Sequence, residues 1–497
     1  MKMRKLVALL SVCVMLVASL AGCGKKADNG NTGNTDTTTT PTAAPADNGG
    51  DTAANDEIVT LKWVTVGNGM PTNYAAWQEK INAYLGEKIG VNLDIEVVPW
   101  GDWDNRSNII INSGEYYDIL FTDGGKYNSA AKMGAFVDIT DLAKTVSPDL
   151  YSYIPEDYWK ATSVDGKVYA VPTYKDSSAT QYFVWDKAIV DKYSVDYQNL
   201  NTLDSLSDKL KEIKDGEGTA PFVLMNNGAS SVLANYDPMG AGLPVIGVRF
   251  DDASHKVVSV FEQEDILSQL DVLHQWYKDG IINADAPTIA EVSNYRMVFT
   301  AQGWPSAAKT TWGPNMGVEA VAAQTGDTIV SNDTVRGSLN AISAASKYPE
   351  KCLEFLQLVN LDSKVRDALY YGLEGENFKY NDAGEIEKLN SDWTMAGYTQ
   401  GTFFTVTKLA GEINQWDEVK ALNAAAKPSV LLGFTMDTAK VETEVAQCKA
   451  VYEKYKSILL TGAQDPRELV KQLRSELDAA GFEAIMTEAQ AQIDAAY

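Results

Sequence analysis

The amino-acid composition changes abruptly near residue 57, and this change decides which part of the chain can fold. Residues 24–56 are almost wholly Gly, Asn, Asp, Thr, Ala and Pro, without an aromatic or large aliphatic side chain. Such a segment cannot bury enough apolar surface to become ordered. Roughly 440 residues follow, which exceeds the size of one compact core and predicts two lobes.

The residues before this segment have the organisation of an export signal. A basic start is followed by an apolar run at 6–20, which is too short to span a membrane as a helix. The letters LAGC that end at Cys23 resemble the lipobox of bacterial lipoproteins. This resemblance implies a signal peptide at 1–22, a lipidated (palmitate-bearing) Cys23, and a tether at 23–56. An ordinary secretory signal with a chance cysteine is the alternative.

The charge and the scarce histidines exclude several classes of function. A formal net charge of −25 disfavours nucleic acid and anionic lipid surfaces as partners. It also disfavours a strongly anionic ligand, unless a local basic pocket overrides the average. The chain has only His255 and His274, which counts against many enzyme classes. Cys352 and Cys448 lack metal spacing and are expected to be buried free thiols, so we expect no metal and no cofactor.

Helical and strand periodicities alternate after residue 58. Apolar spacing predicts strands at 58–66, 91–97 and 118–121 and a helix at 74–88. Further helices are predicted around 266–277, 349–359, 441–459 and 466–477, and hairpins around 251–254 and 381–384. The strand–helix–strand order indicates an α/β lobe with parallel strand pairs. Ligands of such sheets lie beyond the carboxyl ends of the strands. We expect four side chains to project there: Asn68, Trp100, Trp103 and Asp123.

Aromatic residues stand beside polar residues in segments predicted as loops. An exposed ring suits the flat face of a pyranose, and neighbouring polar groups can bind its hydroxyls. The candidates for stacking are Trp100, Trp103, Tyr174, Tyr236, Trp304, Trp312 and Tyr371. The candidates for hydrogen bonding are Asn68, Asp123, Lys175, Asp237, Asn340 and Glu374. Each aromatic residue taken alone has core packing as its alternative.

Several segments together resemble the bacterial extracellular solute-binding proteins of carbohydrate-type ABC importers (family 1). They are GEYYDIL at 114–120, AKMGAFVDITDL at 131–142, DGKVYAVP at 165–172, GSLNAIS at 337–343, YPEKCLEFL at 348–356 and YYGLEGENF at 370–378. The last segment is similar to the LipO-like subgroup, whose members carry an extra C-terminal domain, here about 391–497.

The resemblance implies an α/β, two-lobed periplasmic-binding-protein fold (type II-like), with hinge strands between the lobes and the ligand in the cleft. Lobe 1 is expected to comprise 57–175 plus 342–395, and lobe 2 to comprise 176–341 plus 396–497 with a helical C-terminal region. Crossings are expected near 174–178, 336–341 and 395–405. Trp304 or Trp312 stands where related sugar binders place a stacking ring. The expected effect of Trp312→Ala is at least tenfold weaker sugar binding with little change in melting temperature.

We therefore expect a monomeric receptor on the extracellular face of the cell membrane, attached only by its lipid. It would capture a small solute, an oligosaccharide above all, and deliver it to the transmembrane permease subunits of an ABC importer. It would not be an enzyme. The alternatives are a surface glycoside hydrolase or lyase, a non-importing lectin, and a receptor for a peptide or another polar solute.

Overall fold

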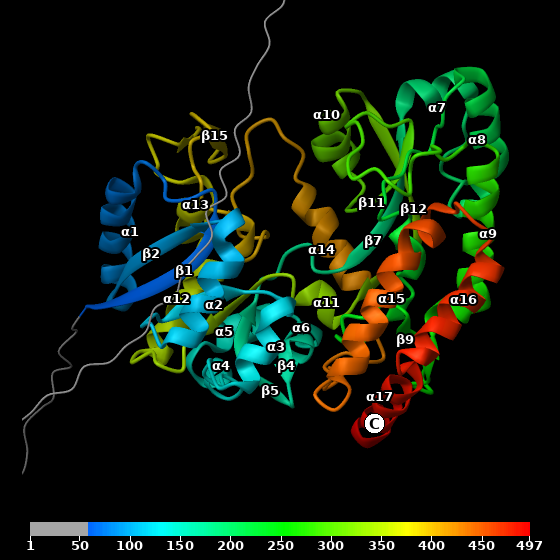
Figure 1. Cartoon of the computed structure of the whole chain (residues 1–497). Coiled ribbons are helices and arrows are strands. Elements are labelled where there is room, and N and C mark those ends of the chain that lie inside the picture. The colour runs from blue at the N-terminus through cyan, green and yellow to red at the C-terminus, as the bar shows by residue number, and fades with distance from the viewer. Residues whose placement is uncertain (1–57) are drawn as a thin grey trace, which may run out of the picture. The chain divides into compact units, whose positions relative to one another are not determined.

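The computed structural model describes residues 58–497, and Asp56–Tyr497 form one compact unit. The predictions for the signal peptide, Cys23 and the tether lie outside the described residues. Within 58–497, no helix combines the length and the apolar character needed to cross a bilayer. Helices and strands are mixed along this part, and its two main sheets belong to separate groups of elements (Figure 1).

The first sheet has five strands in the order β2-β1-β3-β13-β6. Their bounds are β1 (Val59–Gly67), β2 (Val91–Pro99), β3 (Ile119–Thr122), β6 (Ala170–Pro172) and β13 (Leu339–Ile342). β1 pairs in parallel with β2 and β3, whereas β13 runs antiparallel to β3 and β6. Gly67 lies opposite Pro99, and Leu339 lies opposite both Thr122 and Pro172. The carboxyl ends of β1, β2, β3 and β6 therefore meet at one edge.

Helices cover this sheet and bury its apolar side chains. They are α1 (Tyr74–Ile89), α2 (Trp103–Ser113), α3 (Gly124–Lys132), α4 (Leu142–Val146), α5 (Pro148–Tyr153), α6 (Glu156–Thr162), α12 (Pro349–Leu361) and α13 (Ser363–Tyr371). α1 shows why they form: Trp77, Ile81 and Leu85 recur on one buried stripe. Gly90, at φ 65°, ends α1 in a left-handed turn. Two small hairpins join β4 (Ser163–Val164) to β5 (Lys167–Val168) and β14 (Phe378–Tyr380) to β15 (Ile386–Lys388).

The second sheet has the order β11-β7-β12-β16. Its strands are β7 (Ala179–Asp186), β11 (Val298–Gln302), β12 (Ala320–Val330) and β16 (Lys427–Pro428). A three-stranded sheet accompanies it, formed by β8 (Tyr236–Asp237), β9 (Ile246–Arg249) and β10 (Val257–Ser259). The helices of this part are α7 (Lys187–Tyr193), α8 (Leu203–Glu217), α9 (Glu264–Lys278), α10 (Gly313–Met316), α15 (Glu442–Thr461), α16 (Pro466–Ala479) and α17 (Phe482–Ala496). All of them except α10 share a core with β7 that includes Trp185, Trp276 and Leu459.

Most elements predicted from periodicity are confirmed, including both hairpins and the parallel pairs of the first sheet. At the start of α16, Asp465 accepts hydrogen bonds from the backbone of Arg467 and Glu468, as expected of an N-cap residue. Cys352 and Cys448 are buried and free, as predicted.

Three connections join the two main sheets. Residues 173–178 lead from β6 to β7, and α11 (Asn332–Val335) leads from β12 towards β13. The third crossing was predicted near 395–405, and this prediction is wrong. The backbone of Phe403 donates to Tyr174 and that of Ala396 to Val66, so this segment lies on the first sheet. The chain reaches the second sheet only at β16, after α14 (Gln415–Ala425).

Candidate functional site

The carboxyl edge of the first sheet carries several of the predicted residues. Asn68 follows β1, Trp100 follows β2, and Asp123 follows β3. Asn68 and Trp100 are exposed, and Asp123 is half-buried because its carboxylate caps α3 through the backbone N–H of Gly125. Trp103 differs from them. It begins α2 and is buried against Phe121, with the ring centroids 5.2 Å apart.

The exposed ring of Trp100 is paired with a second exposed aromatic ring. The Trp100 side chain is 44% exposed and that of Tyr398 is 45% exposed. Their rings are stacked at an interplanar angle of 12°, with centroids 6.2 Å apart. Tyr398 was not predicted from the sequence, although it carries the same signal as the other candidates, an aromatic residue among Gly and Thr. The edge thus presents an apolar platform.

Buried polar side chains hold the segment that carries Tyr398. Asn340 donates from Nδ2 to the carbonyls of Thr399 (3.2 Å) and Gln400 (3.1 Å). Arg366 donates from Nε to the carbonyl of Thr402 at 2.7 Å, and from Nη2 to that of Gly397. Burial lowers the pKa of the Arg366 guanidinium to about 10, so it stays charged at neutral pH. Asn340, predicted to contact ligand, is buried here and positions the platform.

The other predicted aromatic residues of this group are packed inside. Tyr174 lies among Tyr158 and Phe404, with ring centroids 5.4 Å and 4.7 Å away. Tyr371 belongs to α13, and its hydroxyl donates to the carbonyl of Thr407 at 2.8 Å. Trp312 ends a π-helical turn and is only 8% exposed. The expectation that these three rings are exposed is therefore wrong, because each ring packs against apolar neighbours and is buried.

The remaining predicted residues lie in three different surroundings. The Nζ of Lys175 contacts the carboxylate of Asp176 at 2.7 Å. Glu374 is exposed in the turn between α13 and β14. Trp304 is half-buried, and its Nε1 donates to Gln415 on α14 at 3.1 Å. None of these three lines the cavity described next.

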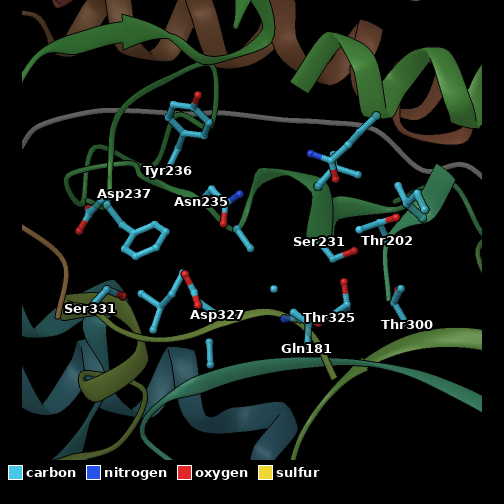
Figure 2. Close-up of a pocket in the computed structure, with 18 of the residues that line it drawn as sticks. Gln181, Thr202, Ser231, Asn235, Tyr236, Asp237, Thr300, Thr325, Asp327 and Ser331 are labelled. Carbon is cyan, nitrogen blue, oxygen red and sulfur yellow. The ribbon is translucent and has the colours of Figure 1, made fainter. Parts of the chain in front are cut away.

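A cavity of about 760 Å³ lies over the second sheet. Its walls come from β7, β11, β12, β8, α11, the start of α8 and the middle of α9. Polar side chains outnumber apolar ones in the lining, although apolar atoms contribute more of its exposed surface. Figure 2 labels ten of the lining residues: Gln181, Thr202, Ser231, Asn235, Tyr236, Asp237, Thr300, Thr325, Asp327 and Ser331. Only Tyr236 and Asp237 were predicted from sequence, because the rest are ordinary residues that lie far apart along the chain.

The two predicted residues of the cavity are already engaged by the protein. The Tyr236 hydroxyl donates to Asp265 at 2.8 Å. The Asp237 carboxylate accepts from the hydroxyl of Ser429 (2.7 Å) and the backbone N–H of Met239 (2.9 Å). Burial raises the pKa of the Asp237 carboxyl group. These contacts shape the wall and leave less hydrogen-bonding capacity for a ligand.

Other polar side chains of the cavity have their hydrogen-bonding groups free. Within 58–497, no protein group bonds to the side-chain amides of Gln181 and Asn235 or to the hydroxyls of Ser231, Thr300 and Thr325. Figure 2 shows Gln181 and Thr325 on the side of the sheet, with Asn235 and Ser231 across from them. Amides and hydroxyls both donate and accept, so the cavity suits a polar uncharged molecule. In this described part, no group of three or more metal-ligating side chains occurs.

Helix α14 contacts residues from both parts of the molecule. The Gln415 side chain accepts from Trp304 and, at 2.8 Å, from the Thr310 hydroxyl. At the other end of α14, the Asn423 side chain accepts from the Ser178 hydroxyl in the first connection at 2.8 Å. Between them, the Trp416 ring lies 4.4 Å from that of Phe403 and 6.0 Å from that of Trp304. The third connection is thus bonded to the first.

The two-sheet architecture with a polar cavity defines a class of protein, the ligand-binding components of transport systems. A family described as bacterial extracellular solute-binding protein matches residues 79–372, and the chain belongs to this family. A second match, to a domain of unknown function, covers residues 430–497. The family is one of binding proteins, so the protein is a solute receptor and not an enzyme.

Relatives and solved structures agree with this assignment. A carbohydrate ABC transporter substrate-binding protein of Streptococcus pneumoniae is 28% identical, covering 97% of this chain and 96% of the relative. The N-glycan transport solute binding protein of the same species superposes with a TM-score of 0.78 at 26% identity, over 88% of this chain and 98% of that one. An extracellular solute-binding protein from Bifidobacterium longum subsp. infantis (TM-score 0.63, 16% identity, 89% and 99% covered) shares the fold. The predicted two-lobed solute-binding fold is confirmed.

Proposed function

We propose that the protein captures an oligosaccharide outside the cell and presents it to the membrane subunits of an ABC importer. The cavity over the second sheet carries this proposal. Its free amide and hydroxyl groups offer donors and acceptors from several directions, as the many hydroxyls of a sugar require. Its volume of about 760 Å³ is within the usual range of small-molecule sites.

The aromatic platform of Trp100 and Tyr398 supports a sugar over a peptide. Two parallel exposed rings offer flat apolar surface to the CH-rich face of a pyranose. The N-glycan transport solute binding protein of Streptococcus pneumoniae has been solved in complex with Man1GlcNAc and with Man5GlcNAc. A similar ligand for this chain follows from that likeness as part of the proposal.

The proposal includes closure of two lobes over the ligand. The predicted lobe 1 (57–175 plus 342–395) and lobe 2 (176–341 plus 396–497) are retained with one change: β13 and residues 396–403 lie on the first sheet and so belong to lobe 1. The two lobes close on a ligand that contacts both, because such a ligand favours the closed state. Of the residues predicted to bind, we retain as ligand contacts those with exposed or half-exposed side chains: Asn68, Trp100, Asp123, Lys175, Tyr236, Trp304 and Glu374. Lipidation at Cys23 would keep the monomeric receptor on the outer face of the membrane, beside its permease.

Calorimetric titration of the purified protein tests the proposed ligand class. The titrants are mannose-containing N-glycan fragments, other neutral oligosaccharides, and short peptides of similar mass. We expect saturable binding of at least one oligosaccharide without turnover of the sugar. Binding of peptides alone would retain the receptor and reject the sugar. Asn235→Ala, in the cavity, should lose most of the affinity. The matched control Asn199→Ala, on the exposed surface, should retain it.

A further inference from the structure

The main cavity continues into two smaller ones along the same side of the second sheet. A cavity of about 330 Å³ shares Gln181, Ser231 and Thr300 with the main cavity. A further cavity of about 470 Å³ shares Arg296 and Phe299 with this second one. The shared residues make the three cavities one groove, whose far end lies against Trp312 and Asn315.

Charge is distributed unevenly along this groove. The charged residues that line the main cavity are all acidic: Asp204, Asp237, Asp327 and Asp333. The two smaller cavities are lined by one cation, Arg296, and by one carboxylate, Glu291. The single cation of the groove therefore stands where the two smaller cavities meet.

Arg296 differs from every other arginine that the structure describes. Arg106, Arg249, Arg467 and Arg474 form ion pairs, and the buried Arg336 and Arg366 donate to backbone carbonyls. The Arg296 guanidinium has no ion pair within 58–497, and its Nε is buried without a hydrogen-bond partner. Glu291 lines the same cavity but forms no ion pair with it.

The surroundings hold the guanidinium in place without neutralising it. Its Cζ lies 3.8 Å from the centre of the Phe299 ring, a close cation–π contact. Burial without a countercharge is unfavourable and lowers the pKa of Arg296. An anion from outside the protein would relieve this cost. A planar guanidinium also matches a carboxylate with two parallel hydrogen bonds.

We infer that Arg296 binds the carboxylate of an acidic sugar residue at one end of the bound oligosaccharide. This inference rests on the proposed function, since the uncharged part of the ligand occupies the main cavity. The net charge of −25 disfavours anionic ligands in general. A local cation in a partly desolvated groove overrides that average, because its attraction is less screened than at the surface.

The test compares pairs of oligosaccharides that differ only in an acidic end. Sialic-acid-capped N-glycans and the same glycans after desialylation form one pair. Oligosaccharides ending in a hexuronate or in the corresponding hexose form a second. We expect the purified protein to bind the acidic member of at least one pair at least tenfold more tightly. Arg296→Gln should abolish this preference and leave both the affinity for the neutral member and the melting temperature nearly unchanged.

Two further variants separate charge from geometry. Arg296→Lys keeps the charge but loses the paired hydrogen bonds, so we expect part of the preference to remain. Glu291→Gln removes the acid from the same cavity and should preserve or increase the preference. Equal or tighter binding of the neutral member of both pairs would overturn the inference and leave the proposed function intact. A preference for sulfated over carboxylated ends would overturn the carboxylate assignment. Failure of every oligosaccharide to bind would overturn the proposed function and the inference together.

Discussion

The two surfaces described above differ in how much of their binding capacity is already used by the protein. At the carboxyl edge of the first sheet, buried groups such as Asn340 and Arg366 are bonded to the segment 397–402. What the edge exposes is apolar surface, the stacked rings of Trp100 and Tyr398. Over the second sheet, the cavity exposes polar groups that the described protein leaves free, among them Gln181 and Asn235.

This difference separates two contributions to recognition. A rigid aromatic surface stabilises the complex with any ligand that has an apolar face, and so it discriminates little among sugars. Directed amides and hydroxyls reject a ligand whose own groups do not match, because unmatched polar groups lose their hydration without compensation. We therefore expect the first surface to supply affinity and the second to supply selectivity.

The largest expected effect concerns Trp312, which lies at the far end of the groove, outside the main cavity and the aromatic platform. Trp312 is buried against Tyr182, with ring centroids 5.6 Å apart, and fills the space beside Gly303. Truncation of a buried tryptophan costs about 3–5 kcal/mol. We now expect Trp312→Ala to lower the free energy of unfolding by this amount in denaturant titrations. An unchanged melting temperature with lost sugar binding would restore Trp312 as the stacking residue.

Next in size is the loss of a free amide in the cavity. Gln181→Ala should weaken oligosaccharide binding by about 10–100-fold, corresponding to about 1–3 kcal/mol for an unmatched polar group. Calorimetry measures the change, and the melting temperature should stay constant. Gln324→Ala is the matched control: this glutamine is exposed on β12, outside the cavity, and donates to the carbonyl of Gly326. Equal losses in both variants would contradict a role for the cavity.

A smaller effect is expected at the aromatic platform. Trp100→Ala should weaken binding of several different sugars by a similar factor of about 2–10, from about 0.5–1.5 kcal/mol for one aromatic contact. Trp100→Phe should restore part of the affinity. A change that depends strongly on the sugar would show that the platform also selects, and would remove the distinction drawn between the surfaces.

The smallest effect separates stability from binding. Glu115 accepts two hydrogen bonds from the Arg106 guanidinium, each at 2.7 Å, which lowers the pKa of its carboxyl to about 2 from a usual 4.5. Because the folded pKa is lowered, the stabilisation is present above pH 4.5 and is lost as the pH falls towards 2. Solvent screening limits it to less than about 1 kcal/mol. Glu115→Gln should therefore lower the melting temperature slightly at pH 7, have a smaller effect at pH 2, and leave sugar affinity unchanged.

Sequence patterns predicted the elements well because each depends on neighbouring residues. The stripe of α1, its end at Gly90 and the cap of α16 are local features that a reader of the chain can find. The site depends instead on which distant residues meet. Gln181, Ser231 and Thr325 carry no individual signal, and only folding brings them around one cavity. Burial also could not be inferred: Trp100 and Trp103 have similar local sequence, yet one is exposed and the other is core.

The contacts of helix α14 have a spectroscopic consequence. Trp416 lies between Phe403, whose neighbours belong to the first sheet, and Trp304, which follows β11 of the second. The two indoles are 6.0 Å apart and inclined at 52°. Two such chromophores at this distance give a near-ultraviolet circular dichroism and a fluorescence that depend on their mutual orientation. The unlabelled protein thus contains an optical reporter of any rearrangement that moves α14 relative to the segment of Trp304.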